Sequence, residues 1–174
     1  CIADDIFRLG KAAEASPPRH IPYDPWGRRV DRIEVSRAWE ELGRIAASMG
    51  LVGMAYERRY GEYSRMLQFA RVYLFGASSA LYTCPLAMSD GAARAIELYG
   101  DNTLKQGAFK KLISCNPADF WTAGQWMTER EGGSDVSQSA TVAIPNKDGY
   151  RLSGTKWFTS AINAPMAMTL ARIK

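Results

Sequence analysis

The sequence has 174 residues, enough to bury the core of one or two small domains, and 47% of them are hydrophobic. Its 22 Lys and Arg against 18 Asp and Glu give a formal net charge of +4, an ordinary balance for a globular protein, and no apolar run approaches the ~20 residues that a membrane span requires. One histidine and three well-separated cysteines, Cys1, Cys84 and Cys115, exclude a histidine metal cluster, a zinc site and a disulfide framework.

The first 115 residues are predicted to form helices joined by irregular segments. A short helix is expected at 1–15, and the prolines that follow it predict an extended loop up to Gly27. Apolar residues then recur at helical spacing in four main helices. The second of these is expected to be longer and more buried than the first. The four helices are expected at 35–49, 63–81, 85–100 and 104–113.

Three arginines, Arg28, Arg29 and Arg32, form the densest basic group of the chain. We favour a solvated turn beside a helix for them, and the alternative is a contact with an anion or a nucleic acid. His20, in the same Pro-rich stretch, is expected to be a surface loop residue.

From residue 118 the pattern changes from helical to strand-like. Residues 120–127 mix aromatic and β-favouring side chains and predict a strand. Residues 138–144 alternate, and a turn signal at Asn146, Lys147, Asp148 and Gly149 predicts a hairpin with 150–153. Another strand is expected at 157–158. The sequence therefore predicts an α+β fold with segregated layers, a helical domain over 1–117 and the start of a β domain over 118–174.

The chain begins at Cys1 rather than Met, and it ends on a predicted strand, 168–174, with nothing after it to pair with or cover it. Because proteins normally protect such edges, we expect the chain to be part of a longer protein. Its cysteine usage fits a reducing compartment, so we expect the cytoplasm or the mitochondrial matrix.

The stretch 124–137, GQWMTEREGGSDVS, is a poor core sequence and a good ligand-holding loop. Gly132 and Gly133 allow close backbone approach and positive φ, while Thr128 and Ser134 supply hydroxyls without bulk. A strand that leads into such a loop predicts a cofactor site.

This stretch resembles the signature of the acyl-CoA dehydrogenase flavoprotein family, in which a hydrophobic residue precedes Thr-Glu-x-x-x-Gly-Ser-Asp. Residues 149–160, GYRLSGTKWFTS, resemble the family's later strand, where Gly-x-Lys precedes an aromatic pair and a Thr or Ser that faces the flavin. The chain is most similar to the AidB-like branch. The stretches that carry this similarity are PYDPWGRRVDRIEVSRAWEEL at 22–42, CPLAMSDGA at 84–92 and TEREGGSDVS at 128–137.

The resemblance implies an FAD-dependent oxidoreductase that dehydrogenates, or binds, fatty acyl-CoA thioesters as a homotetramer. It also implies a β-barrel-like middle domain after the helical domain, and a C-terminal helical domain outside this chain. The family's catalytic glutamate comes from that last domain, so no catalytic residue is expected here. The AidB-like branch implies an alternative, a flavin-containing regulatory protein that binds nucleic acid or a fatty-acyl ligand with little turnover. This segment carries no feature that supports nucleic-acid binding.

The resemblance further implies a set of FAD contacts. Thr128 would face the pyrimidine side of the flavin, where negative charge develops on reduction, although a strand threonine can also be a β-branched filler residue. Ser134 matches the serine that contacts the cofactor pyrophosphate or the pantetheine arm. Phe158 and Ser160 align with positions that stack near the isoalloxazine and hydrogen-bond around N5 and O4. The full set of expected cofactor-binding residues is Met127, Thr128, Gly133, Ser134, Phe158 and Ser160.

Two carboxylates of the signature are expected to be structural. Asp135 is expected to cap the loop by accepting backbone N–H bonds, and Glu129 matches a structural residue of the family. The chain also departs from the dehydrogenases, because Arg130 replaces the usual Pro, Trp157 is shifted by one place and Ser160 replaces Thr.

Overall fold

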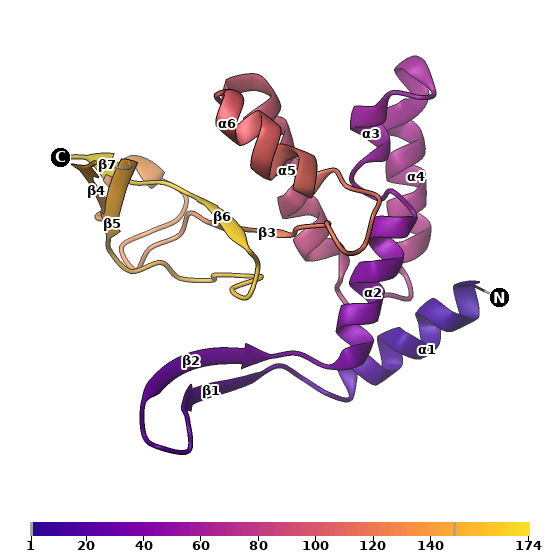
Figure 1. Cartoon of the computed structure of the whole chain (residues 1–174), viewed down its shortest axis with the longest axis horizontal. Helices are drawn as coiled ribbons and strands as arrows, with labels where there is room; N and C mark the ends of the chain where they lie inside the picture. The colour runs from indigo at the N-terminus through magenta and orange to yellow at the C-terminus, as the bar shows by residue number, and fades with distance from the viewer. Residues whose placement is uncertain (1, 148) are drawn as a thin grey trace.

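The computed structural model describes residues 2–147 and 149–174 and has an α+β fold, as expected (Figure 1). The helical part comes first along the chain. Its main helices are α1 (Ile2–Glu14), α2 (Arg37–Ser48), α4 (Ser64–Gly76) and α5 (Thr83–Tyr99). The shorter helical elements are α3 (Met54–Glu57), η1 (Gly61–Tyr63), α6 (Asn102–Leu104), η2 (Lys105–Phe109), α7 (Lys110–Leu112) and η3 (Val136–Gln138).

Helix α2 begins where the sequence supplies a capping residue. The side chain of Ser36 accepts a hydrogen bond from the backbone N–H of Trp39, at 3.2 Å, and thereby satisfies one of the free N–H groups at the helix start. The buried face of α2 packs against α1. Helix α1 also contacts the segment after α4, because a Cβ on Gly10 would lie 2.3 Å from the carbonyl oxygen of Ser78. The resulting core cluster contains Ile6, Ala13, Leu42, Ala46, Leu51, Val52, Phe75, Tyr82 and Leu86.

A polar network joins α3, α4 and α5. The hydroxyl of Tyr56 donates to the Asp90 carboxylate at 2.6 Å, and Arg65 donates to both carboxylate oxygens at 2.7 and 2.6 Å. The buried amide of Gln68 accepts from Arg65 and donates to the carbonyl of Leu51. These bonds link α3, α4 and α5 to one another.

The predicted extended loop after α1 is wrong, because the segment forms an antiparallel hairpin of β1 (Arg19–Tyr23) and β2 (Arg29–Glu34). Asp24 closes the turn by accepting hydrogen bonds from the backbone N–H groups of Trp26 and Arg28, both at 2.9 Å. Pro22 does not prevent pairing, because the register shifts between Ile21 and Tyr23. The hairpin extends away from the helices in Figure 1.

The expected helix at 63–81 is shorter than predicted and is not the more buried one. Helix α4 ends at Gly76, and its buried side chains include the polar Ser64 and Gln68. The large apolar residues Met66, Phe69, Tyr73 and Leu74 are each more than half exposed. The helical period therefore selected a face of α4 that is exposed, whereas the buried face carries Ser64, Gln68 and Phe75.

Strands dominate the second part of the chain. Strand β3 (Ala123–Trp126) pairs in parallel with β6 (Met166–Thr169). Strand β4 (Val142–Asn146) pairs with β5 (Gly149–Ser153) in the predicted hairpin, although Asp148 of its turn lies outside the described residues. Strand β4 also pairs in parallel with β7 (Arg172–Ile173).

Two of the strand predictions are wrong. Residues 157–158 form a bend, because Phe158 has a φ of +54° and Ala161 a φ of +52°, which a strand does not accommodate. The predicted strand at 168–174 is divided between β6 and β7, and both are paired with earlier strands. Periodicity alone does not reveal such long-range pairing.

The helical and β parts share a core through α5 and β3. The hydroxyl of Ser89 accepts from the backbone N–H of Ala123 at 2.9 Å, and it donates to the carbonyl of Pro85. Ala123 is fully buried against Ala92, Ala93, Ile96 and Leu112. This contact fixes the start of β3, and therefore the start of the signature loop, on the helical part. Within the described residues, no helix combines the length and the apolar character of a membrane span.

Candidate functional site

The two signature segments, at 124–137 and 149–160, meet directly in the structure. The backbone N–H of Trp157 donates to the carbonyl of Thr128 at 2.9 Å, and the indole N–H of Trp126 donates to the carbonyl of Ser160 at 3.0 Å. A Cβ on Gly124 would lie 2.6 Å from the Trp126 ring, so only glycine lets the indole reach this position. Residues about thirty positions apart thus form one surface.

The buried carboxylate of Glu129 links segment 124–137 to segment 149–160. Its carboxylate, with only 6% of the residue exposed, accepts from the Ser139 hydroxyl at 2.6 Å, the Thr141 hydroxyl at 2.5 Å and the N–H of Ala140 at 2.5 Å. The ammonium of Lys156 donates to the same carboxylate at 2.7 Å. The hydrogen bond from Lys156, followed by those from Ser139 and Thr141, holds the pKa of Glu129 well below its usual range. An ion pair so enclosed is structural, in agreement with the sequence-based expectation.

This lowered pKa predicts a pH dependence. A carboxyl group whose pKa falls on folding stabilises the folded state above its ordinary value of 4.5 and loses that contribution as the pH falls further. Glu129→Gln is therefore expected to lower the midpoint of thermal unfolding at neutral pH, by an amount that shrinks below about pH 4.5. The exposed neighbour Glu131 gives the matched control, Glu131→Gln. An unchanged difference between wild type and Glu129→Gln from pH 7 to pH 4 would contradict the role of this ion pair.

The two glycines of the loop serve different needs. Gly132 has a φ of +157°, which residues with side chains rarely adopt, and it bonds with Glu129 in both directions across the loop. Gly133 has no positive φ, so that part of the expectation for this glycine is wrong. A Cβ on Gly133 would lie 3.0 Å from the hydroxyl oxygen of Thr128 and 3.1 Å from its methyl group. Close contact with Thr128 is the physical reason for this glycine.

Asp135 caps the end of the signature loop, as predicted. Its carboxylate accepts from the Ser137 hydroxyl at 2.6 Å and from the Ser137 backbone N–H at 3.0 Å. These bonds lower the pKa of Asp135. The hollow inside the loop measures only about 10 Å³, room for about one water molecule. A cofactor therefore has to contact the outer surface of the loop.

The outer surface offers polar groups that the fold does not use. Among residues 2–147 and 149–174, the hydroxyls of Thr128, Ser134 and Ser160 have no hydrogen-bond partner, whereas nearby Ser139 and Thr141 are both bonded to Glu129. Ser134 and Ser160 are exposed, and Thr128 and Met127 are half-buried.

Phe158 presents an aromatic ring on the same part of the chain. It is 80% exposed and sits in a left-handed conformation that is costly for a residue with a side chain. The N–H of Ser160 donates to its carbonyl at 3.0 Å, so the two predicted contact residues are held together. The structure places Ser134 on the loop without a bond to either of them. Exposed hydroxyls and an exposed aromatic ring are groups that can hydrogen-bond to and stack on a planar polar ligand.

A cavity of about 370 Å³, here the junction cavity, lies between the helical and β parts. Of the six predicted cofactor residues, Ser160 alone lines it. The other residues come from elements far apart in the sequence, so no local pattern points to the cavity. Their only sequence signal is that several fall within the family-like stretches at 22–42 and 84–92. The lining includes Trp39, Leu81, Tyr82, Cys84, Thr122 and Ser160.

The arginine group belongs to the β1–β2 hairpin rather than to a turn beside a helix. Arg28 pairs with Asp24, Arg29 with Asp31 and Arg32 with Glu34, at 2.9, 2.5 and 2.5 Å. His20 lies exposed on β1 and pairs with Asp31, whose pKa is lowered by Arg29 and His20. Arginines already neutralised by neighbouring carboxylates favour the solvated interpretation over an anion site. In the described part of the chain, no three His, Cys, Asp or Glu side chains come together as a metal site.

Comparison with known proteins points in one direction. A family model described as the adaptive response protein AidB N-terminal domain matches residues 2–117. The chain is 43% identical, over 178 residues, to acyl-CoA dehydrogenase family member 11 of Caenorhabditis elegans, and the match covers 99% of this chain and 29% of the relative. It is 28% identical to the putative acyl-CoA dehydrogenase AidB of Escherichia coli, covering 97% of this chain and 33% of the relative.

Solved structures agree with these relatives. The C. elegans protein in complex with C11-CoA matches with a TM-score of 0.91 and 43% identity over 98% of this chain and 30% of that one. The apo form of a protein called Bd2924 matches with a TM-score of 0.95 and 52% identity over 98% of this chain and 35% of that one. The chain thus spans about a third of the length of the proteins that it matches.

Proposed function

We propose a function from one premise, namely that the chain belongs to the acyl-CoA dehydrogenase family, in its AidB-like branch. The family is FAD-dependent. In this proposal residues 1–117 form the helical domain and residues 118–174 the first part of the β domain of an FAD-dependent, acyl-CoA dehydrogenase-like protein. The protein binds a fatty acyl-CoA thioester, assembles as a homotetramer and works in the cytoplasm or the mitochondrial matrix.

One observation supports the FAD assignment. The hydroxyls of Thr128 and Ser160 have no hydrogen-bond partner among the described residues, and they lie near the hydrogen bond that joins Thr128 to Trp157. FAD, when bound, supplies the hydride acceptor. Thr128 and Ser160 donate hydrogen bonds to the flavin ring where negative charge develops on reduction, and Phe158 stacks near it. Ser134 binds the pyrophosphate or the pantetheine arm.

Two further residues shape this surface. Met127 packs beside the ring, and Gly133 leaves room for the Thr128 side chain. Neither residue has a side-chain hydrogen-bond donor, so both contribute only to the shape of the surface that the flavin contacts. With these two the proposed FAD contacts are complete for this chain.

The junction cavity supports the acyl-binding part of the proposal. The apolar Leu81 and Trp39 line it together with Ser160, so an acyl group there would lie near a residue proposed to contact the flavin. The C. elegans relative has been solved with C11-CoA bound. The chain supplies this binding surface, whereas the glutamate base that the family requires for proton removal lies outside it.

The full-length protein is expected to purify yellow, with about one FAD per subunit. Anaerobic addition of an acyl-CoA of suitable chain length is expected to bleach the flavin absorbance, because the hydride moves to the cofactor. A colourless protein that takes up no FAD on reconstitution would refute the proposed function. Acyl-CoA that binds without bleaching, across short and long chains, would support the regulatory alternative with little turnover.

The hydroxyl contacts can be tested separately. Thr128→Val and Ser160→Ala are each expected to weaken FAD binding roughly 10- to 100-fold or to shift its reduction potential, because a hydrogen bond to a charged group contributes about 1.5–3 kcal/mol. Thr169→Val is the matched control, since the Thr169 hydroxyl is already bonded to the carbonyl of Trp126. Titration of the apoprotein with FAD measures the affinity. Equal losses in all three variants would mean that the effect comes from the fold and not from flavin contacts.

A further inference from the structure

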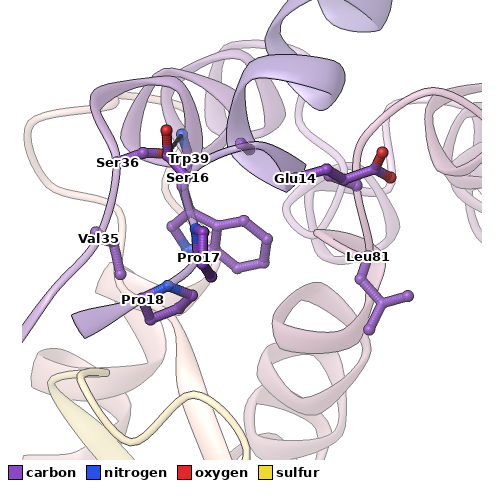
Figure 2. A pocket seen from close by; sticks show the side chains of 10 residues that line it. Glu14, Ser16, Pro17, Pro18, Val35, Ser36, Trp39 and Leu81 are labelled. Carbon is purple, nitrogen blue, oxygen red and sulfur yellow. Dashed lines mark hydrogen bonds between the residues drawn. The ribbon is translucent and has the colours of Figure 1, made fainter. Parts of the chain in front are cut away.

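A second cavity, here the proline cavity, lies on the other side of Trp39 and Leu81 from the junction cavity. It measures about 350 Å³ and is formed where the end of α1, the start of the β1–β2 hairpin and the start of α2 come together (Figure 2). Figure 2 shows Pro17 and Pro18 beside the Trp39 ring, with Leu81 across from them. Three residues, Val35, Trp39 and Leu81, line both cavities. The two spaces are therefore neighbours with a common wall.

Leu81 of the common wall belongs to a loop, residues 79–81, with three unusual features. Leu81 is 78% exposed although it is apolar, so nothing in the described chain covers it. The backbone is left-handed at both Ala80 and Leu81, with φ of +44° and +61°, a conformation that costs free energy at each residue. The hydroxyl of Ser79, just before them, is fully buried and has no hydrogen-bond partner within the described residues.

The lining of the proline cavity determines what kind of ligand it accepts. Apolar groups of Ala13, Pro17, Pro18, Val35 and Trp39 dominate it. The Ser36 hydroxyl is already occupied by capping α2. A polypeptide segment would bring N–H and C=O groups that find no partner here, whereas a saturated alkyl chain has no such groups.

The charge at the edge of the cavity decides which end of an alkyl chain enters. Glu14 is exposed and contributes to the lining, so a carboxylate brought there would meet a like charge. A methyl end has no charge to repel. The ligand therefore enters with its methyl end and keeps its polar end elsewhere.

We propose that the proline cavity holds the methyl end of a long saturated acyl chain whose thioester end lies in the junction cavity, with Leu81 and Trp39 lining the passage between them. This proposal rests on the proposed function and names its substrate class, long-chain acyl-CoA. Leu81 is then a specificity-determining residue, because only an acyl chain long enough to pass its side chain reaches the proline cavity.

The test uses the full-length FAD-loaded protein and a series of saturated acyl-CoAs from C4 to C20, with dissociation constants from titration calorimetry. Each methylene buried in wild type is expected to raise the affinity about fourfold, up to the longest chains that reach the proline cavity. Ser16→Trp, which adds a ring at an exposed lining position, is expected to leave C4 binding unchanged and to end this rise at a shorter chain. Ala12→Trp is the matched control, because Ala12 is exposed on α1 and does not line the cavity.

A second variant tests the charge argument without filling the cavity. An acyl-CoA of long chain with a terminal carboxylate is expected to bind wild type weakly and to bind Glu14→Lys at least tenfold more tightly, while binding of the unsubstituted chain changes little. An equal effect of Glu14→Lys on both ligands would overturn the proposal.

The remaining outcomes are also decisive. Identical chain-length dependence in wild type and Ser16→Trp would overturn the proposal, and lower thermal stability in that variant would mean that a polypeptide segment covers the cavity instead. A uniform loss of affinity from C4 upward would place the effect in the fold and would equally overturn it. Wild-type protein that binds FAD but no acyl-CoA of any length would refute acyl binding altogether, and failure to bind FAD would refute the proposed function itself.

Discussion

Lys156→Met is expected to lower the flavin-release temperature of the full-length protein by more than the loss of any one neutral hydrogen bond of this site would. The Lys156 side chain is 9% exposed, and its ammonium donates to Glu129 and Ser139. Without it, the enclosed Glu129 carboxylate loses its counter-charge. Removal of one partner from a buried ion pair costs about 3–5 kcal/mol.

The measurement is flavin fluorescence during heating, because release of FAD reports on the contact between the two signature segments. Lys147→Met is the control, since Lys147 is an exposed lysine on the same part of the chain. The double variant Lys156→Met with Glu129→Leu is expected to recover part of the loss, because it removes the unpaired charge as well. A Lys156→Met protein that releases FAD at the wild-type temperature would show that the ion pair does not support the cofactor surface.

Gly133→Val is expected to reduce FAD affinity by roughly 5- to 100-fold. A Cβ at this position meets both the hydroxyl oxygen and the methyl carbon of Thr128 at 3.0 and 3.1 Å, so Thr128 has to move, and it is the residue proposed to face the flavin. Such overpacking costs about 1–3 kcal/mol. FAD titration of the apoprotein measures the effect.

Gly107→Val separates this effect from glycine replacement in general, since a Cβ there meets nothing within 4 Å and Gly107 lies in η2, in the helical part. Loss of FAD affinity in both variants would mean that the fold, rather than the position of Thr128, is affected. An unchanged FAD affinity in Gly133→Val would contradict the proposed contact between Thr128 and the flavin, because the valine forces the Thr128 side chain to move.

The sequence predicts local features of this fold well, since local features depend on nearby residues. Helix α5 ends at Gly100 as expected, and the hairpin of β4 and β5 follows from its turn signal. Asp135 caps the loop because an aspartate two residues before a free N–H does so in many contexts. The paired motifs also identified the family, since they depend on residue identity and spacing.

Features that depend on distant contacts are the ones that the sequence does not reveal. Met66, Phe69, Tyr73 and Leu74 of α4 are exposed because no described residue covers them, which the helical period does not reveal. Gly133 is required by the Thr128 side chain, a contact visible only after the loop is folded. The junction cavity combines Trp39, Leu81 and Ser160, which are up to about 120 positions apart in the chain.

The parallel pairing of β3 with β6 has a consequence for how the site comes into being. Strand β3 leads into the signature loop, but its partner strand begins only at Met166, about forty residues later. During synthesis from the N-terminus, the helices and Ala123 are made well before β6, so the signature loop emerges from the ribosome without the strand that supports it. Non-local pairing of this kind forms late, because chain closure has to precede it. The proposed cofactor surface is therefore among the last parts of this chain to mature, because it lacks its supporting strand until Met166–Thr169 has been made.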